Sequence, residues 1–171
     1  PPIAKRIVLD NGSLPAAYQR DNVDLATEGI DRITPHGVLD RAGVHHDFDV
    51  LIYGTGFQAS RFLTPMQVAG AGGVDLHERW GGDARAYLGI VVPDFPNFFM
   101  MYGPNTNIVI NGSIIYFSEL EARYIHESVR MLLEGGHRSM DVRPEVHNGY
   151  NERVDAANRR MAWGHSSVNT W

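Results

Sequence analysis

Two apolar runs in this chain each end in glycine-rich backbone, and this repeated plan constrains the fold more than any other feature. Residues 50–53, Val-Leu-Ile-Tyr, stop at Gly54-Thr55-Gly56, and residues 98–102, Phe-Phe-Met-Met-Tyr, stop at Gly103-Pro104-Asn105. Short apolar runs are typical of strands in sheets covered on both faces. Glycine permits sharp turns and the close approach of another group. Because ligands gather at the carboxyl ends of strands in open α/β sheets, these segments predict a ligand edge.

The composition of the 171 residues excludes several classes of function. There is no cysteine, which removes disulfides, thiolate nucleophiles and most structural zinc sites. The net charge is −5 and the arginines are dispersed, so we expect no nucleic-acid partner. No apolar run approaches the ~20 residues of a membrane span, and no signal peptide opens the chain. We therefore expect a cytoplasmic location. The histidines are scattered, and His45-His46-Asp47 is interpreted as a solvated lead-in to a strand, so we expect no metal site.

The clearest predicted element is a long helix over residues 113–134. Asn111 or Ser113 is suited to cap its start, and Gly135-Gly136 to end it. Its apolar residues recur at helical spacing, and we expect this stripe to be largely buried. The stripe consists of Ile114, Phe117, Leu120, Tyr124, Ile125, Val129 and Leu132.

The remaining elements are shorter. Residues 22–53 read as short strands around a Thr-Pro-His-Gly turn, ending in the buried run 50–53. Leu76 to Trp80 is a short helix stopped by glycines, whereas Gly70 to Gly73 lacks the GxGxxG pattern and is a loop. Residues 139–142 are a strand candidate. A last helix begins at Pro144, with Val146, Tyr150, Val154 and Met161 facing inward.

Each glycine segment has two interpretations at this point. Gly54-Thr55-Gly56 is a tight turn or a place where a ligand passes. The second segment, Gly103-Pro104-Asn105-Thr106-Asn107, precedes the long helix. Free N–H groups and the helix dipole favour hydrogen-bond-accepting or negative ligand atoms at such a position. The alternative interpretation is an asparagine-rich turn. Composition and spacing alone therefore indicate an α/β piece with a ligand edge at two strand ends.

Several motifs together resemble one family. "DVLIYGTGF" is similar to the ATG-containing segment of flavin-dependent monooxygenases of the Baeyer–Villiger and flavin-containing classes, with Gly54 where alanine is usual. Trp80, Tyr87-Leu88-Gly89, Phe95-Pro96-Asn97 and Gly103-Pro104-Asn105-Thr106 follow in the family's order. The similarity covers nearly the whole chain and is strongest to the Baeyer–Villiger type.

The resemblance implies an incomplete fold. Such enzymes carry one GxGxxG for FAD and another for NADPH, and neither occurs here. The chain therefore resembles the C-terminal portion of a two-dinucleotide-binding-domain flavoprotein, an α/β piece with short strands and two C-terminal helices. Residues 1–53 are expected to end the NADPH-binding domain, and residues 54–171 to be the returning half of the FAD-binding domain.

The resemblance also implies cofactor sites. Gly54, Thr55, Gly56 and Phe57 are expected where the backbone crosses between the domains beside FAD and NADPH. Gly103, Pro104, Asn105, Thr106 and Asn107 are expected to bring amides and the helix end near the flavin ring. The family's active-site arginine would lie upstream, so no catalytic residue is assigned.

The implied function is that of part of an FAD- and NADPH-dependent monooxygenase, which inserts one oxygen atom from O2 into a ketone or oxygenates a heteroatom. The fragment alone is expected to be inactive. Its expected partners are the missing N-terminal portion, a small-molecule substrate and further copies of itself, through exchanged strands or helices. Two alternatives stay open: a non-catalytic flavoprotein-like chain that pairs with a partner, and another two-dinucleotide flavoprotein reductase.

Overall fold

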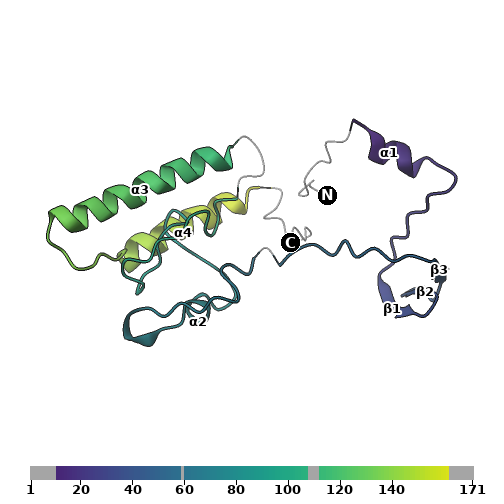
Figure 1. Cartoon of the computed structure of the whole chain (residues 1–171), viewed down its shortest axis with the longest axis horizontal. Helices are drawn as coiled ribbons and strands as arrows, with labels where there is room; N and C mark the ends of the chain where they lie inside the picture. Colours follow the sequence, from purple (N-terminus) through teal and green to yellow (C-terminus); the bar gives the residue numbers. More distant parts are fainter. Residues whose placement is uncertain (1–10, 59, 108–111, 162–171) are drawn as a thin grey trace. The chain divides into compact units, whose positions relative to one another are not determined.

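The computed structural model describes residues 11–58, 60–107 and 112–161, which form two compact units (Figure 1). The smaller unit ends at Phe57 and the larger unit begins at Gln58. The smaller contains a short helix and a sheet, and the larger contains the long helices. Helices and short strands thus occur together, as the α/β prediction requires.

The smaller unit is built on an antiparallel sheet of three strands. Helix α1 (Ser13–Tyr18) precedes β1 (Ile30–Thr34), β2 (Gly37–Asp40) and β3 (His45–Asp47), which pair in the order β1-β2-β3. The predicted Thr-Pro-His-Gly turn is confirmed, because it joins β1 to β2. The strand predicted around residues 23–25 is absent.

Two residues explain the geometry of this sheet. A Cβ on Gly37 would collide with the backbone carbonyl of His46, so only glycine allows β2 and β3 to approach this closely. The buried Asp40 carboxylate accepts hydrogen bonds from the N–H groups of Ala42 and Val44 at 2.9 and 2.8 Å, and it lies 3.0 Å from the His46 ring. The His46 hydrogen bond, followed by that from Val44, lowers the pKa of Asp40.

The prediction of a buried strand over residues 50–53 is wrong. Val50, Ile52 and Tyr53 are 71%, 85% and 69% exposed, and the segment forms no strand. A strand exists only when its N–H and C=O groups pair with a neighbouring strand. Within the described residues the sheet ends at β3, so the segment has no strand with which to pair.

The larger unit contains α2 (Leu76–Trp80), α3 (Ile114–Glu134) and α4 (Pro144–Asn158), and all three helices were predicted. Asp75 caps α2, because its carboxylate accepts from the N–H groups of His77 and Glu78. Gly81, with φ 56°, ends the helix. The glycine-rich loop prediction is also confirmed, since Ala71–Gly73 is a single 3₁₀ turn, η1.

The core of the larger unit lies between α2 and the irregular segment 84–100. Its buried side chains are Leu76, Trp80, Ala86, Val92, Phe95 and Met100. The Trp80 indole donates a hydrogen bond to the Arg85 carbonyl at 2.8 Å, so this ring packs without leaving its N–H unpaired.

The buried strand predicted over residues 98–102 is also wrong. Met100 is buried, but Met101 is 51% exposed, and no strand is formed. Asn97 and Tyr102 have φ angles of 59° and 56°, which are left-handed conformations incompatible with a strand. The segment therefore turns at both ends and places only its middle in the core.

Helix α3 confirms the predicted bounds but corrects the predicted burial. Ser113 caps its start by accepting a hydrogen bond from the Tyr116 N–H, whereas Asn111 lies outside the described residues. The stripe is not largely buried: Ile114, Leu120 and Val129 are 48%, 47% and 41% exposed. Phe117, Tyr124, Ile125 and Leu132 are half-buried, and the buried positions are Glu121 and Ser128. The described residues therefore bury only a narrow stripe along the surface of this helix.

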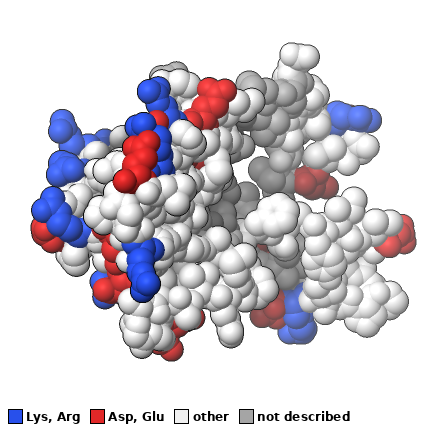
Figure 2. All heavy atoms as spheres, turned by 60° about the vertical axis from the view of Figure 1, so that its left-hand side comes forward, with Lys and Arg blue, Asp and Glu red and all other residues white. Residues whose placement is uncertain are grey.

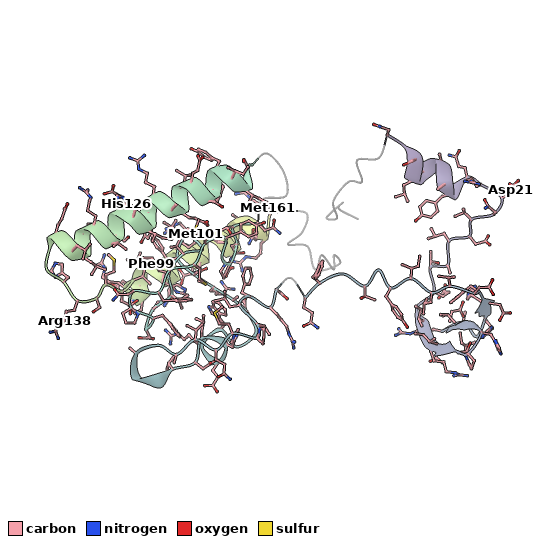
Figure 3. All side chains as sticks on the ribbon, viewed as in Figure 1. Asp21, Phe99, Met101, His126, Arg138 and Met161 are labelled. Carbon is pink, nitrogen blue, oxygen red and sulfur yellow. The ribbon has the colours of Figure 1, made fainter. Side chains whose placement is uncertain are left out.

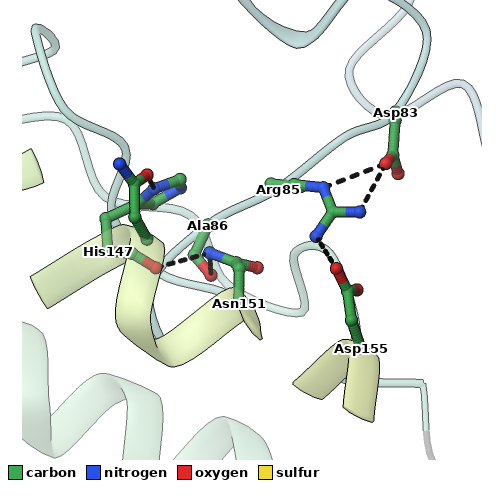
Figure 4. Close-up of polar contacts among 7 residues, drawn as sticks. Asp83, Arg85, Ala86, His147, Asn151 and Asp155 are labelled. Atoms are coloured by element: carbon green, nitrogen blue, oxygen red, sulfur yellow. Dashed lines mark hydrogen bonds and ion pairs between the residues drawn. The ribbon is translucent and has the colours of Figure 1, made fainter. Parts of the chain in front are cut away.

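Helix α4 is held to the segment 83–86 by polar contacts (Figure 4). Arg85 donates to Asp155 at 2.8 Å and to Asp83 at 2.7 and 2.9 Å. Asn151 donates to the carbonyls of His147 at 2.9 Å and Ala86 at 3.4 Å. These contacts tie the helix to the core, and the two carboxylates raise the pKa of Arg85.

The expectations around α4 are partly confirmed. Val146, Tyr150 and Val154 are half-buried, but Met161 lies beyond the helix and is 42% exposed (Figure 3). Residues 139–142 form no strand. Instead, the main chain of Met140 pairs with the main chain and side chain of Asn97, which replaces the expected ladder.

Charges of both signs lie among one another on the face shown in Figure 2, and most of that face is uncharged. Among the described residues, no group of three or more acidic or histidine side chains is arranged to hold a metal ion. No helix in these ranges has both the length and the apolar character needed to cross a membrane.

Candidate functional site

The loop formed by residues 103–107 lies between the core segment and α3. Gly103, Pro104 and Thr106 are buried, whereas Asn105 and Asn107 are exposed. Asn105 has a left-handed φ of 63°. The structure therefore brings the five predicted residues together as one loop whose buried positions fix the backbone and whose asparagines face outward.

The loop is seated against Gly89 by direct contact of backbone with backbone. A Cβ on Gly103 would collide with the carbonyl oxygen of Gly89, and a Cβ on Gly89 would collide with the Thr106 methyl group. The Thr106 hydroxyl donates to the Gly103 carbonyl at 2.8 Å and closes the turn. The Tyr-Leu-Gly and Gly-Pro-Asn-Thr motifs are separate in sequence but are thus packed against each other through Gly89, Gly103 and Thr106. Sequence reasoning used Gly89 as a family signal but missed its role at the site.

Tyr102 holds the start of the loop through two hydrogen bonds. Its hydroxyl donates to the Asn107 side chain at 2.6 Å, and its N–H donates to the Glu121 carboxylate at 2.9 Å. Glu121 comes from α3 and is 3% exposed. Sequence reasoning missed Glu121 because it followed only apolar residues along the helix. The available signal was its position four residues after Phe117 and three before Tyr124, on the inward side.

Gly54, Thr55, Gly56 and Phe57 belong to the smaller unit and are all exposed. Phe57 is 96% exposed. A Cβ on Gly54 or Gly56 would meet no atom within 4 Å, although Gly56 has a φ of 76° that favours glycine. The chain's own packing therefore gives no steric reason for Gly54, and the space beside both glycines is open.

An aromatic cavity lies elsewhere in the larger unit. It has a volume of about 230 Å³, and Tyr87, Phe95, Phe98, Phe99 and Tyr124 contribute rings to its lining. No residue of the 103–107 loop lines it. Burial raises the pKa of Tyr124, and burial also raises that of Tyr150, whose ring contacts Tyr87 edge-on. The cavity is separate from the predicted ligand edge.

The chemistry of the 103–107 loop is that of a binding element. Its outward groups are the amides of Asn105 and Asn107, which donate and accept hydrogen bonds. Residues 103–107 contain no titratable side chain, so they supply no general acid or base. The backbone cradle of Gly89 and Gly103 and the exposed amides are compatible with holding one polar edge of a flat ligand.

The fold is similar to part of one class of protein, the two-dinucleotide-binding flavoprotein monooxygenases. The oxidized, NADP-bound steroid monooxygenase has the same fold over 98% of this chain and 32% of its own, with a TM-score of 0.80 and 30% sequence identity. No family model matches the chain.

Curated relatives agree with this likeness. The FAD-binding monooxygenase ktnD of Aspergillus niger is 37% identical over 98% of this chain and 28% of its own length. A Baeyer-Villiger monooxygenase of Pseudomonas aeruginosa is 31% identical over 98% of this chain and 31% of its own length. The chain is thus a homologue of FAD-binding and Baeyer–Villiger monooxygenases. It spans about 30% of their length, which is consistent with a C-terminal piece.

The Gly89–Gly103 contact predicts a position-specific loss of stability. Gly103→Ala should lower the free energy of unfolding by about 1–3 kcal/mol, because the new methyl group meets main chain that cannot rotate away. Gly54→Ala is the matched control, since its methyl group enters open space and its φ is not left-handed. Denaturant unfolding of both variants measures the difference. Equal stability of the two would contradict the contact.

Proposed function

We propose that this chain is the C-terminal part of an FAD- and NADPH-dependent monooxygenase. The reaction class is insertion of one oxygen atom from O2 into a ketone, as in a Baeyer–Villiger oxidation, or oxygenation of a heteroatom. The observation that carries the proposal is the 37% identity to an FAD-binding monooxygenase across 98% of the chain. The fold shared with an NADP-bound steroid monooxygenase supports it.

Two parts of the sequence, divided at residue 53 and not at the boundary between the two units, have proposed places in the intact protein. Residues 1–53 would end the NADPH-binding domain, and residues 54–171 would be the returning half of the FAD-binding domain. Gly54, Thr55, Gly56 and Phe57 would carry the backbone across between the domains beside the cofactors. Their exposure and the open space beside the two glycines support a role that the chain's own packing does not require.

The loop of residues 103–107 would hold the flavin ring. A bound FAD would supply the redox chemistry, namely reduction by NADPH and the transfer of one oxygen atom from O2 to the substrate. The chain's own contribution would be to orient the ring: Gly103 and Pro104 fix the backbone, and Asn105 and Asn107 offer amides. Thr106 would keep the turn closed through its bond to the Gly103 carbonyl. The loop orients rather than transfers protons, because it has no titratable group.

A second candidate function is a non-catalytic chain that pairs with a protein partner. The exposed apolar residues Val50, Ile52 and Tyr53 favour some covering surface, which is either the rest of the same protein or a partner. The third alternative, a reductase acting through a redox disulfide, would have to take both cysteines from outside these 171 residues, which contain none. The cytoplasmic location stays a prediction.

The proposed function predicts a yellow, NADPH-oxidising intact protein. We expect stoichiometric flavin by absorbance and faster NADPH oxidation when a ketone is added. The isolated 171-residue chain should bind neither cofactor tightly, because it lacks both phosphate-binding glycine turns. A colourless intact protein that binds no added FAD would refute the function. If the isolated chain were yellow, it would bind flavin by itself, and this would refute the proposal that the phosphate-binding turns lie outside these 171 residues.

Self-association of the isolated chain is a separate proposal. Val50, Ile52, Tyr53 and Phe57 expose apolar surface in a segment that forms no strand, which favours pairing with another copy. We expect a dimer or larger oligomer at micromolar concentration, with strands or helices exchanged. Light scattering over a dilution series measures this, and replacing Val50 and Ile52 by threonine should shift the series toward monomer. A monomer at every concentration would show that these residues do not drive association.

A further inference from the structure

Glu121 is a buried carboxylate with only one partner. Its side chain is 3% exposed, and its Oε2 atom accepts the hydrogen bond from the Tyr102 N–H at 2.9 Å. Its Oε1 atom is buried and has no hydrogen-bond partner among the described residues. None of the ion pairs in the described part of the chain includes it. Among the described residues, one of its oxygens is thus used, and no cationic side chain forms an ion pair with it.

The partner of Glu121 is a backbone position that needs support. Tyr102 has a φ of 56°, a left-handed conformation that is unfavourable for a residue with a Cβ atom. Such conformations persist where surrounding contacts fix them, and they cluster at functional sites. The next residue, Gly103, packs on Gly89, and the Tyr102 hydroxyl binds Asn107 at the far end of the loop. The Glu121 bond therefore fixes the residue at which the chain enters the 103–107 loop.

We propose that Glu121 is a positioning residue for the flavin-facing loop and that it acts as a hydrogen-bond acceptor, not as a charge. In the described residues no cation pairs with this carboxyl group, so an ion pair does not account for its place in the interior. What the loop receives from Glu121 is a single acceptor oxygen that holds the Tyr102 N–H. The inference rests on the proposed function, because it takes flavin to be the ligand of the loop.

Two substitutions separate the acceptor from the charge. Glu121→Gln keeps the shape and one acceptor oxygen but removes the charge. Glu121→Met has a similar length but no comparable acceptor, so the Tyr102 N–H loses its hydrogen bond to the side chain at position 121. The matched control is Glu152→Met, the same change at an exposed position on α4.

The first measurement is flavin affinity, by fluorescence titration of the flavin-free intact protein. We expect Glu121→Gln and Glu152→Met to bind FAD like the wild type, and Glu121→Met to bind it about tenfold or more weakly. Two results would overturn the inference. Loss of affinity in Glu121→Gln would show that the charge is needed, and wild-type affinity in Glu121→Met would show that the bond does not position the loop.

The second measurement is hydrogen–deuterium exchange of the Tyr102 amide in the flavin-free protein. The exchange rate of this amide should be about tenfold or more higher in Glu121→Met than in the wild type, and it should be unchanged in Glu121→Gln. If Glu121→Met does not fold, slow exchange in both the wild type and Glu121→Gln supports the inference, and fast exchange in either overturns it. A wild-type protein that binds no FAD would refute the proposed function, whereas the exchange data would still decide whether Glu121 fixes Tyr102.

Discussion

The contact between the backbones of Gly89 and Gly103 is the constraint on which the candidate site depends. A methyl group on either residue would collide with the opposite segment, so the two backbone segments meet at a distance that only glycine permits. This contact seats the 103–107 loop on the segment 84–100, which also forms the core against α2. The loop is therefore part of a packed scaffold, and its outward asparagines are presented from fixed backbone.

The two long helices are joined to this scaffold by polar contacts as well as by aromatic side chains such as Tyr150, whose ring contacts Tyr87. Glu121 links α3 to Tyr102, and Arg85 and Asn151 link α4 to the segment 83–86. Apolar burial contributes less than the sequence of α3 predicts, because Ile114, Leu120 and Val129 stay exposed. A chain that spans about 30% of its relatives' length covers only part of its apolar surface. Specific hydrogen bonds therefore add to the apolar contacts that hold the two helices.

The helices of the larger unit and the strand pair around the Thr-Pro-His-Gly turn could be predicted from the sequence, whereas helix α1 and the outcome at two apolar runs could not. Helix α3 depends on local periodicity and on caps such as Ser113, both of which the sequence contains. The expected strands at 50–53 and 98–102 depend on pairing partners, and apolar character alone does not supply them. The 103–107 loop could be predicted because its glycine follows an apolar run. Glu121 could not, because a search for apolar periodicity passes over a carboxylate that turns inward to bind a backbone N–H.

We propose that the 103–107 loop, held by Gly89 and Glu121, contacts the flavin ring. The most direct measurement is a titration of the flavin-free intact protein with FAD, followed through the backbone and side-chain amide signals of Asn105 and Asn107 by nuclear magnetic resonance. We expect large changes in the chemical shifts of both asparagines and no change in the backbone amide signal of the exposed Glu152 on α4. Saturating FAD that leaves both asparagine signals unmoved would contradict it.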